Sequence, residues 1–203
     1  MRKLALTSAI LLIATTCLAD RLVLTPRGKK ILNQQVRIEY LNEASREQGY
    51  IWLGYGVNDL VELELVSDYF ADFELSPSLN ASYNIVPPVT DIAPGISVGM
   101  LDTLNRTELG RAAYFAITFR LGNWDELNQD VPTEFTLGFW DRDAGVVFGS
   151  VSLPISTQLS LIAEHDSTNL TAGFQVSPDP DLDLRVLFRK SQVMLGLRFQ
   201  LGR

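Results

Sequence analysis

The single histidine of the chain, His165, lies in a cluster of residues that could do acid–base chemistry. The stretch LSLIAEHDSTNLTAGFQV (159–176) places Glu164 and Asp166 on either side of it and Ser167 one residue further on. A histidine that accepts the proton of a serine hydroxyl turns that serine into a nucleophile for acyl groups. The His-x-Ser spacing therefore supports a minority hypothesis in which His165 and Ser167 are catalytic.

A hairpin is the other interpretation of this stretch, and we favour it. Successive side chains of a strand point to opposite faces, so His165 and Ser167 would share one face while Glu164 and Asp166 would lie on the other. The carboxylate of a catalytic triad would then have to come from elsewhere in the chain. Residues 166–169 are typical of a tight turn capped by Asx side chains, and we expect no enzymatic activity.

The N-terminus has the features of a secretory signal. Arg2 and Lys3 precede a short apolar run, and small residues surround Ala19. This run is too short to span a bilayer, so we predict a cleaved signal peptide over residues 1–19. A lipid anchor on Cys17 is the alternative, but the residues before this cysteine fit a lipoprotein signal poorly.

The mature chain, residues 20–203, is expected to form one domain. Removal of the signal takes away the only cysteine, so no disulfide is expected. It also changes the formal net charge from −7 to −9, because Arg2 and Lys3 are lost. An acidic chain without a basic run is a poor partner for nucleic acid.

The mature chain has one histidine and no cysteine, which excludes the usual spacings of zinc ligands, and we expect no metal or cofactor.

Alternation with a period of two residues runs along most of the chain. The clearest case is FELSPSLNASYNI (73–85), in which apolar and polar residues alternate without a break. A soluble strand has about 5 or 6 residues, whereas a tilted strand needs roughly 9 to 11 to cross a bilayer. Turn signals separate twelve such segments. We expect strands at 36–42, 50–57, 60–67, 73–85, 92–102, 111–121, 133–140, 146–153, 158–166, 169–176, 182–189 and 192–201.

Two architectures fit an exported all-β chain. In a soluble sandwich the apolar faces point inward, whereas in a membrane barrel they meet lipid and the polar faces line the lumen. The long strand, the continuous meander and the ionic polar faces favour an antiparallel up-and-down transmembrane β-barrel of about twelve strands. Aromatic residues near the expected strand ends would form its girdle. These are Tyr50, Trp52, Tyr69, Phe70, Trp124, Phe139 and Trp140.

Charged residues on the polar faces are expected to form an ion-pair network in the lumen. Acids concentrate in the earlier strands and arginines in the later ones, and the first and last strands of a closed barrel are neighbours. Arg185 and Arg198 would therefore face Glu62 and Glu64 across the lumen. The expected network consists of Glu62, Glu64, Glu74, Arg120, Glu134, Glu164, Arg185 and Arg198.

Two stretches of the chain resemble the YjbH-like outer-membrane proteins associated with exopolysaccharide production. One stretch carries Phe148, Gly149, Pro154, Ala163, Glu164, His165, Asp166, Asn169 and Gly173, and the other carries Gly56, Asp59, Leu60 and Glu62. The chain departs from the family pattern at Ser150, where a second glycine is usual, and in ending FQLGR without a terminal aromatic residue.

The resemblance implies a non-enzymatic barrel in the bacterial outer membrane, with a role in exopolysaccharide secretion or envelope maintenance. Expected partners are outer-membrane lipid, the barrel-assembly machinery and polysaccharide or secretion components. The alternative is a lipid-modifying enzyme that uses His165 and Ser167, since an outer-membrane lipid A deacylase has a similar His-x-Ser pair. A third possibility is a soluble periplasmic β-sandwich that binds a partner.

Overall fold

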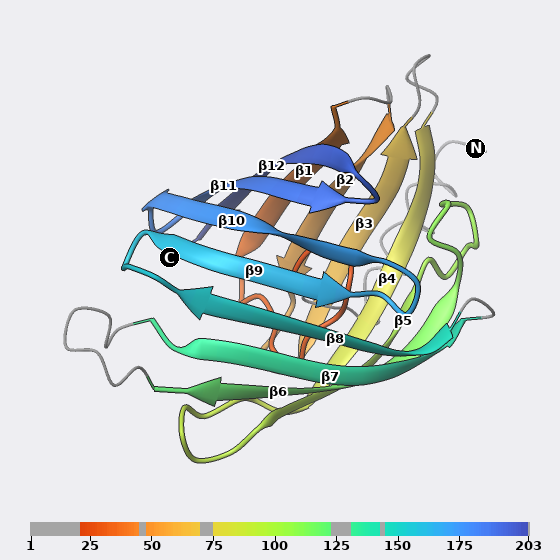
Figure 1. Cartoon of the computed structure of the whole chain (residues 1–203). Coiled ribbons are helices and arrows are strands. Elements are labelled where there is room, and N and C mark those ends of the chain that lie inside the picture. Colours follow the sequence, from red (N-terminus) through yellow and green to blue (C-terminus); the bar gives the residue numbers. More distant parts are fainter. Residues whose placement is uncertain (1–20, 45–47, 70–74, 123–130, 143–144, 203) are drawn as a thin grey trace.

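A computed structural model describes residues 21–44, 48–69, 75–122, 131–142 and 145–202. In these ranges the chain forms twelve antiparallel strands that close into a barrel (Figure 1). The predicted signal peptide lies outside the described residues. The strands are β1 (Val36–Glu43), β2 (Gln48–Gly56), β3 (Val61–Tyr69), β4 (Leu75–Val86), β5 (Gly95–Leu101), β6 (Ala112–Leu121), β7 (Thr133–Arg142), β8 (Gly145–Pro154), β9 (Leu159–His165), β10 (Leu170–Asp179), β11 (Leu182–Arg189) and β12 (Gln192–Leu201).

Each strand pairs with the next along the chain, and β1 closes the barrel by pairing with β12. This closing ladder runs from Val36 opposite Leu201 to Glu43 opposite Met194. The predicted twelve-stranded up-and-down barrel is therefore confirmed, and the soluble sandwich is wrong because the strands form a single closed sheet. No helical stretch of sufficient length and apolar character to traverse a bilayer occurs in the described ranges.

An even number of strands places the start of β1 and the end of β12 at the same end of the barrel. We call this the terminal end; it also holds the turns at residues 57–60, 87–94 and 155–158. The opposite, distal end holds the loop at residues 102–111 and the turn at residues 166–169.

The outer face of the barrel is apolar and the inner face is polar. Leu65 on β3 is 49% exposed, whereas its neighbour Glu64 is 1% exposed. This is the inverse of a water-soluble β protein, which does not normally expose an apolar belt of this extent. Exposed apolar residues from around the barrel include Ile38, Leu53, Leu65, Ile85, Phe119, Leu137, Phe139, Leu161, Phe174, Val186, Leu195 and Phe199.

The inside of the barrel also contains apolar packing, and several aromatic residues expected in a girdle contribute to it. Trp52 and Trp140 are buried, at 1% and 3% exposure, while Phe139 is exposed. The girdle prediction is thus wrong for Trp52 and Trp140, because the register of β2 and β7 turns these positions inward, and Tyr50 and Tyr69 are buried as well. Phe70 and Trp124 lie outside the described residues.

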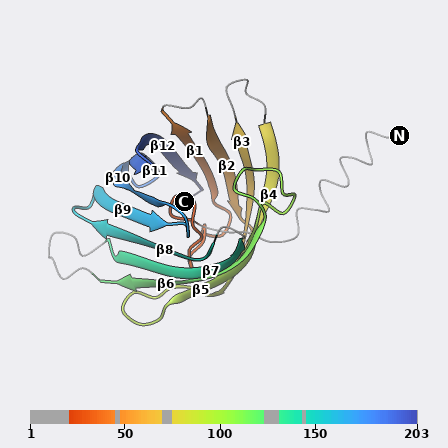
Figure 2. The ribbon, with the colours of Figure 1, turned by 45° about the vertical axis from the view of Figure 1, so that its right-hand side comes forward.

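Residues 21–35, which precede β1, are called the inner segment; residues 21–28 are buried inside the barrel, and residues 32–34 are exposed before β1 begins. Figure 2 shows this red-to-orange coil surrounded by the strands. Leu22, Val23 and Leu24 are buried and pack in one apolar cluster with Trp52 and other inward-facing residues. This stretch has no period-two alternation, so no strand was predicted for it.

Candidate functional site: the charged lumen and its inner segment

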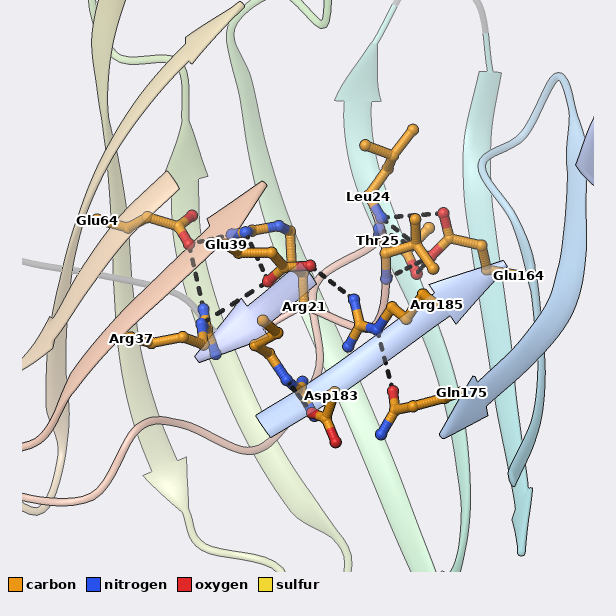
Figure 3. A network of polar contacts seen from close by, with 12 residues as sticks. Arg21, Leu24, Thr25, Arg37, Glu39, Glu64, Glu164, Gln175, Asp183 and Arg185 are labelled. Atoms are coloured by element: carbon orange, nitrogen blue, oxygen red, sulfur yellow. Dashed lines mark hydrogen bonds and ion pairs between the residues drawn. The ribbon is translucent and has the colours of Figure 1, made fainter. Parts of the chain in front are cut away.

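Glu164, on β9, holds the backbone of the inner segment. Its carboxylate accepts hydrogen bonds from the N–H groups of Val23 (3.0 Å), Leu24 (2.9 Å) and Thr25 (3.2 Å), and from the Thr25 hydroxyl (2.9 Å). Figure 3 shows these contacts on one side of the lumen. A buried carboxylate needs donors to replace water, and here the donors are consecutive amides. Glu164 therefore fixes one turn of the inner segment to the barrel wall.

Arg21, at the start of the described inner segment, is bound by two acids of the barrel wall. Its guanidinium lies 3.0 Å from a Glu39 carboxylate oxygen, and it also forms an ion pair with Glu64. The same guanidinium stacks 3.9 Å above the ring of Trp52. A cation that is paired and stacked in a dry interior anchors this segment more firmly than a surface ion pair would.

Arg37, on β1, connects two glutamates of β3. One of its terminal nitrogens lies 3.1 Å from a carboxylate oxygen of Glu62 and 3.1 Å from one of Glu64. Glu62 also accepts a 2.7 Å hydrogen bond from the N–H of Ile31, and Glu64 one of 2.7 Å from Asn80. Both acids thus bind an arginine of the wall and a further donor.

Arg185, on β11, completes this charged layer. It lies 2.6 Å from a carboxylate oxygen of Glu39 and donates a 3.0 Å hydrogen bond to Gln175. We define the central layer as the three buried arginines and three buried glutamates that share these contacts. They are Arg21, Arg37, Arg185, Glu39, Glu62 and Glu64.

A second anchor lies toward the terminal end, around Glu134 of β7. Its carboxylate oxygens lie 2.7 Å from Arg27 and 2.9 Å from Lys29, both of the inner segment, and 3.2 Å from Arg120 of β6. The backbone fits closely at the same place, because a Cβ on Gly28 would lie 2.2 Å from the carbonyl oxygen of Gly95.

The expected lumen residues lie on the inner face wherever they are described, but with partners that differ from those expected. Arg198 pairs with Asp183 across the β11–β12 ladder, and Arg185 pairs with Glu39. Glu62 and Glu64, expected opposite these two arginines, are instead bound by Arg37 and Arg21. The physical reason is that the inner segment and β1 bring closer cations. Glu74 lies outside the described residues.

Five charged residues of this site were not among those predicted from the sequence: Arg21, Arg27, Lys29, Arg37 and Glu39. Arg37 and Glu39 could have been found, since VRIEYLNE alternates like the other strands. Arg21, Arg27 and Lys29, on the inner segment, follow no strand or helix period. Their only signal is the excess of glutamates among the inward-facing positions.

His165 and Ser167 do not form the expected pair on one strand face. His165 is exposed and ends β9, and Ser167 has a left-handed backbone with a φ of 76°. The Ser167 hydroxyl accepts a 2.9 Å hydrogen bond from the Trp140 indole N–H and donates one to the Val147 carbonyl. The alternation therefore stops at His165, and this hydroxyl joins the turn to β7 and β8.

Asp166 caps the turn, as the sequence predicted. Its carboxylate accepts hydrogen bonds from the N–H groups of Thr168 (3.1 Å) and Asn169 (2.7 Å), and it forms an ion pair with Arg189. Burial by itself would raise the pKa of this carboxyl. The Arg189 guanidinium and the hydrogen-bond donors of the turn outweigh the effect of burial, so the pKa of Asp166 lies below its usual value.

Among the described residues, no group of three or more His, Cys, Asp or Glu side chains could hold a metal ion.

Comparison with known structures agrees with the barrel. The sequence matches no protein-family profile and no curated protein sequence. The fold is similar to a structure described as KdgM porin, with a TM-score of 0.53 and 10% identity over 83% of this chain and 99% of that one. It is also similar to the outer membrane protein Omp33 of Acinetobacter baumannii, with a TM-score of 0.53 and 10% identity over 87% of this chain and 100% of that one. At this identity the likeness concerns the fold.

Proposed function

We propose that this protein is a non-enzymatic outer-membrane β-barrel whose lumen is closed by its own inner segment. The observation that carries the membrane assignment is the inverted polarity of the sheet, with apolar residues outside and ionic residues inside. The contacts of Arg21, Arg27 and the 23–25 amides with the wall support a lumen that is filled at rest. The two similar structures carry outer-membrane or porin names, which agrees with this location.

A role in exopolysaccharide secretion or envelope maintenance rests on the resemblance to YjbH-like proteins. In this role the barrel would contact outer-membrane lipid, the barrel-assembly machinery and secretion components.

The word porin in the name of one similar structure suggests a second candidate function, a channel that conducts when the inner segment leaves the lumen. The cavities at the terminal end favour this candidate, because they already reach the segment from one side.

Membrane location is tested by fractionation together with a heat-modifiability gel. The protein should sediment with outer membranes and migrate faster unboiled than boiled, because a closed barrel resists detergent. A soluble protein with identical migration in both lanes would refute the proposal.

The closed lumen is tested by planar-bilayer recording of the wild type and of Gly28→Val. We expect no steady current from the wild type. In Gly28→Val the added side chain overlaps the Gly95 carbonyl, so the inner segment should leave and the barrel should conduct. Gly149→Ala is the matched control, since a Cβ there meets its nearest atoms at 3.4 Å, an ordinary contact distance. A wild type that conducts as well as Gly28→Val would refute the closed lumen.

A further inference from the structure

The outer face of the barrel is hollowed where β4, β5 and β6 approach the distal end. The hollow has a volume of about 670 Å³, and we call it the outer groove. Ala81 of β4 and Ala113 of β6 lie on either side of Met100 of β5 in the sheet, and all three line the groove. Two short side chains beside a long one leave space that the leucines and phenylalanines of the remaining belt would fill.

The outer groove runs along the strands toward the loop at residues 102–111. Tyr83 and Val98, the next outward-facing pair of β4 and β5, border it on the terminal side. Thr103 borders it on the distal side, where its N–H donates a 2.8 Å hydrogen bond to the carbonyl of Leu79. From Leu79 to Tyr83 the groove follows four residues, about 13 Å at 3.3 Å per residue. A segment of an extended hydrocarbon chain can lie along this length.

The surroundings of the outer groove favour hydrocarbon as its occupant. Leu79, Val98 and Met100 supply aliphatic walls. Under the proposed function this face lies in the bilayer, so the groove meets lipid chains and not water. A chain in the groove contacts walls on two sides, whereas a chain on a flat surface has contacts on one side only.

Polar groups lie at the distal edge of the outer groove. Arg111 is exposed, and it precedes Ala113 by two positions, which places both on the same face of the sheet. The loop is held here, because the Asn105 side chain accepts a 3.0 Å hydrogen bond from the N–H of Arg111. The hydroxyl of Thr103 is a further donor in the groove lining. An acid at the same edge, Asp141 of β7, accepts a hydrogen bond from the N–H of Ala113.

We infer that the outer groove binds one acyl chain of a membrane lipid whose phosphate group is held by Arg111. Arginine recognises phosphate through paired hydrogen bonds, and cations at the edge of a bilayer attract phosphate headgroups. The chain lies between Ala81 and Ala113, and the headgroup reaches the loop. This inference rests on the proposed membrane location and adds to it a site for a single lipid.

Native mass spectrometry of the protein, released from an uncharged detergent, tests this inference. Phosphatidylglycerol is the probe, and diacylglycerol with the same acyl chains is the probe without a phosphate. We expect one phosphatidylglycerol to remain on the folded barrel, and at least tenfold less diacylglycerol. Equal retention of both lipids, or retention of neither, would overturn the inference. A mass of two chains without lipid would assign the groove to a second copy and would also overturn it.

Variants that fill the groove locate the site. Ala81→Leu combined with Ala113→Leu adds bulk to the groove and should reduce retention of phosphatidylglycerol at least fivefold. Ala163→Leu combined with Ala172→Leu is the matched control, because these alanines lie opposite each other on β9 and β10 and receive the same bulk. The control should retain the lipid as the wild type does. Equal loss in both double variants would show nonspecific binding and overturn the site.

A charge variant tests the headgroup contact. Arg111→Gln should reduce retention of phosphatidylglycerol severalfold and leave that of diacylglycerol unchanged. Lys190→Gln, exposed at the turn between β11 and β12, is the control and should have no effect. The heat-modifiability gel verifies that each variant is folded. A folded barrel that sediments with outer membranes but retains no phosphatidylglycerol would overturn the lipid site and leave the proposed function intact.

Discussion

The central layer and the anchor around Glu134, which we call the Glu134 anchor, are two charged regions of one lumen, built by the same inner segment and the same kind of strand. The central layer contains three arginines and three glutamates, each at most 4% exposed. The Glu134 anchor contains Arg27, Lys29 and Arg120, and it lies beside two cavities of about 730 Å³ and 350 Å³. Complete burial accompanies close packing in the central layer, and partly exposed cations accompany open space around Glu134.

The difference follows from the cost of burying charge. An ion removed from water must be compensated by partners of opposite sign and by hydrogen bonds. In the central layer Glu39, Glu62 and Glu64 compensate the arginines inside the barrel. Around Glu134 the side chains of Lys29 and Arg120 are partly exposed and reach solvent. The lumen is thus divided into a fully buried part and a part that is open to solvent.

Arg21→Ala should have the largest effect, because it breaks the balance of the central layer. It leaves Glu39 and Glu64 with one cation fewer in a dry interior and removes the stack on Trp52. Breaking a buried pair on one side costs about 3–5 kcal/mol. Urea unfolding in lipid vesicles would measure this loss. Arg106→Ala, on the exposed distal loop, is the control and should change stability little.

Glu134→Gln should lower the free energy of unfolding less, by about 1–2 kcal/mol. Arg27, Lys29 and Arg120 lose a shared acid, but Lys29 and Arg120 are partly exposed and can be solvated. Urea unfolding in lipid vesicles measures this smaller loss of stability. If Glu134→Gln destabilised the barrel as much as Arg21→Ala, the Glu134 anchor would depend on its charges as strongly as the central layer does, and the comparison would fail.

Asp166→Asn is expected to cost about 1 kcal/mol at neutral pH. The pKa of Asp166 is lowered in the folded protein, so its contribution is complete above the unfolded pKa of about 4. It is lost as the pH falls through the lower folded pKa. The wild type and Asp166→Asn should therefore differ in urea unfolding at pH 7 and converge in acid. A difference that stays constant with pH would contradict the ion pair with Arg189.

Ser167→Ala should have the smallest effect, about 0.5–1.5 kcal/mol, through the lost hydrogen bonds to Trp140 and Val147. It should leave the closed lumen and the Glu134 anchor unchanged. Mass spectrometry of envelope lipid should show no difference between the wild type, Ser167→Ala and His165→Ala. Loss of a lipid deacylation in both variants would instead support the enzyme hypothesis.

The strands could be predicted from the sequence because their signal is local. Alternation in segments such as FELSPSLNASYNI depends only on which side of the sheet faces lipid, and it gave twelve strands in the observed order. Inward positions such as Glu62 and Glu164 follow from the same rule. The partners of these glutamates could not be predicted, because Arg21 and the 23–25 amides reach them from a segment without periodicity.

The bonds that hold the inner segment also impose an order on assembly. Leu24 is bound by a residue 140 positions further along the chain, whereas consecutive strands of the barrel pair through short hairpins. Contacts between distant positions form late, because the intervening chain must first be brought together. Residues 21–35 therefore lack their main carboxylate acceptor until β9 has been added. A nascent barrel must keep these residues soluble and unaggregated while three quarters of the sheet is built.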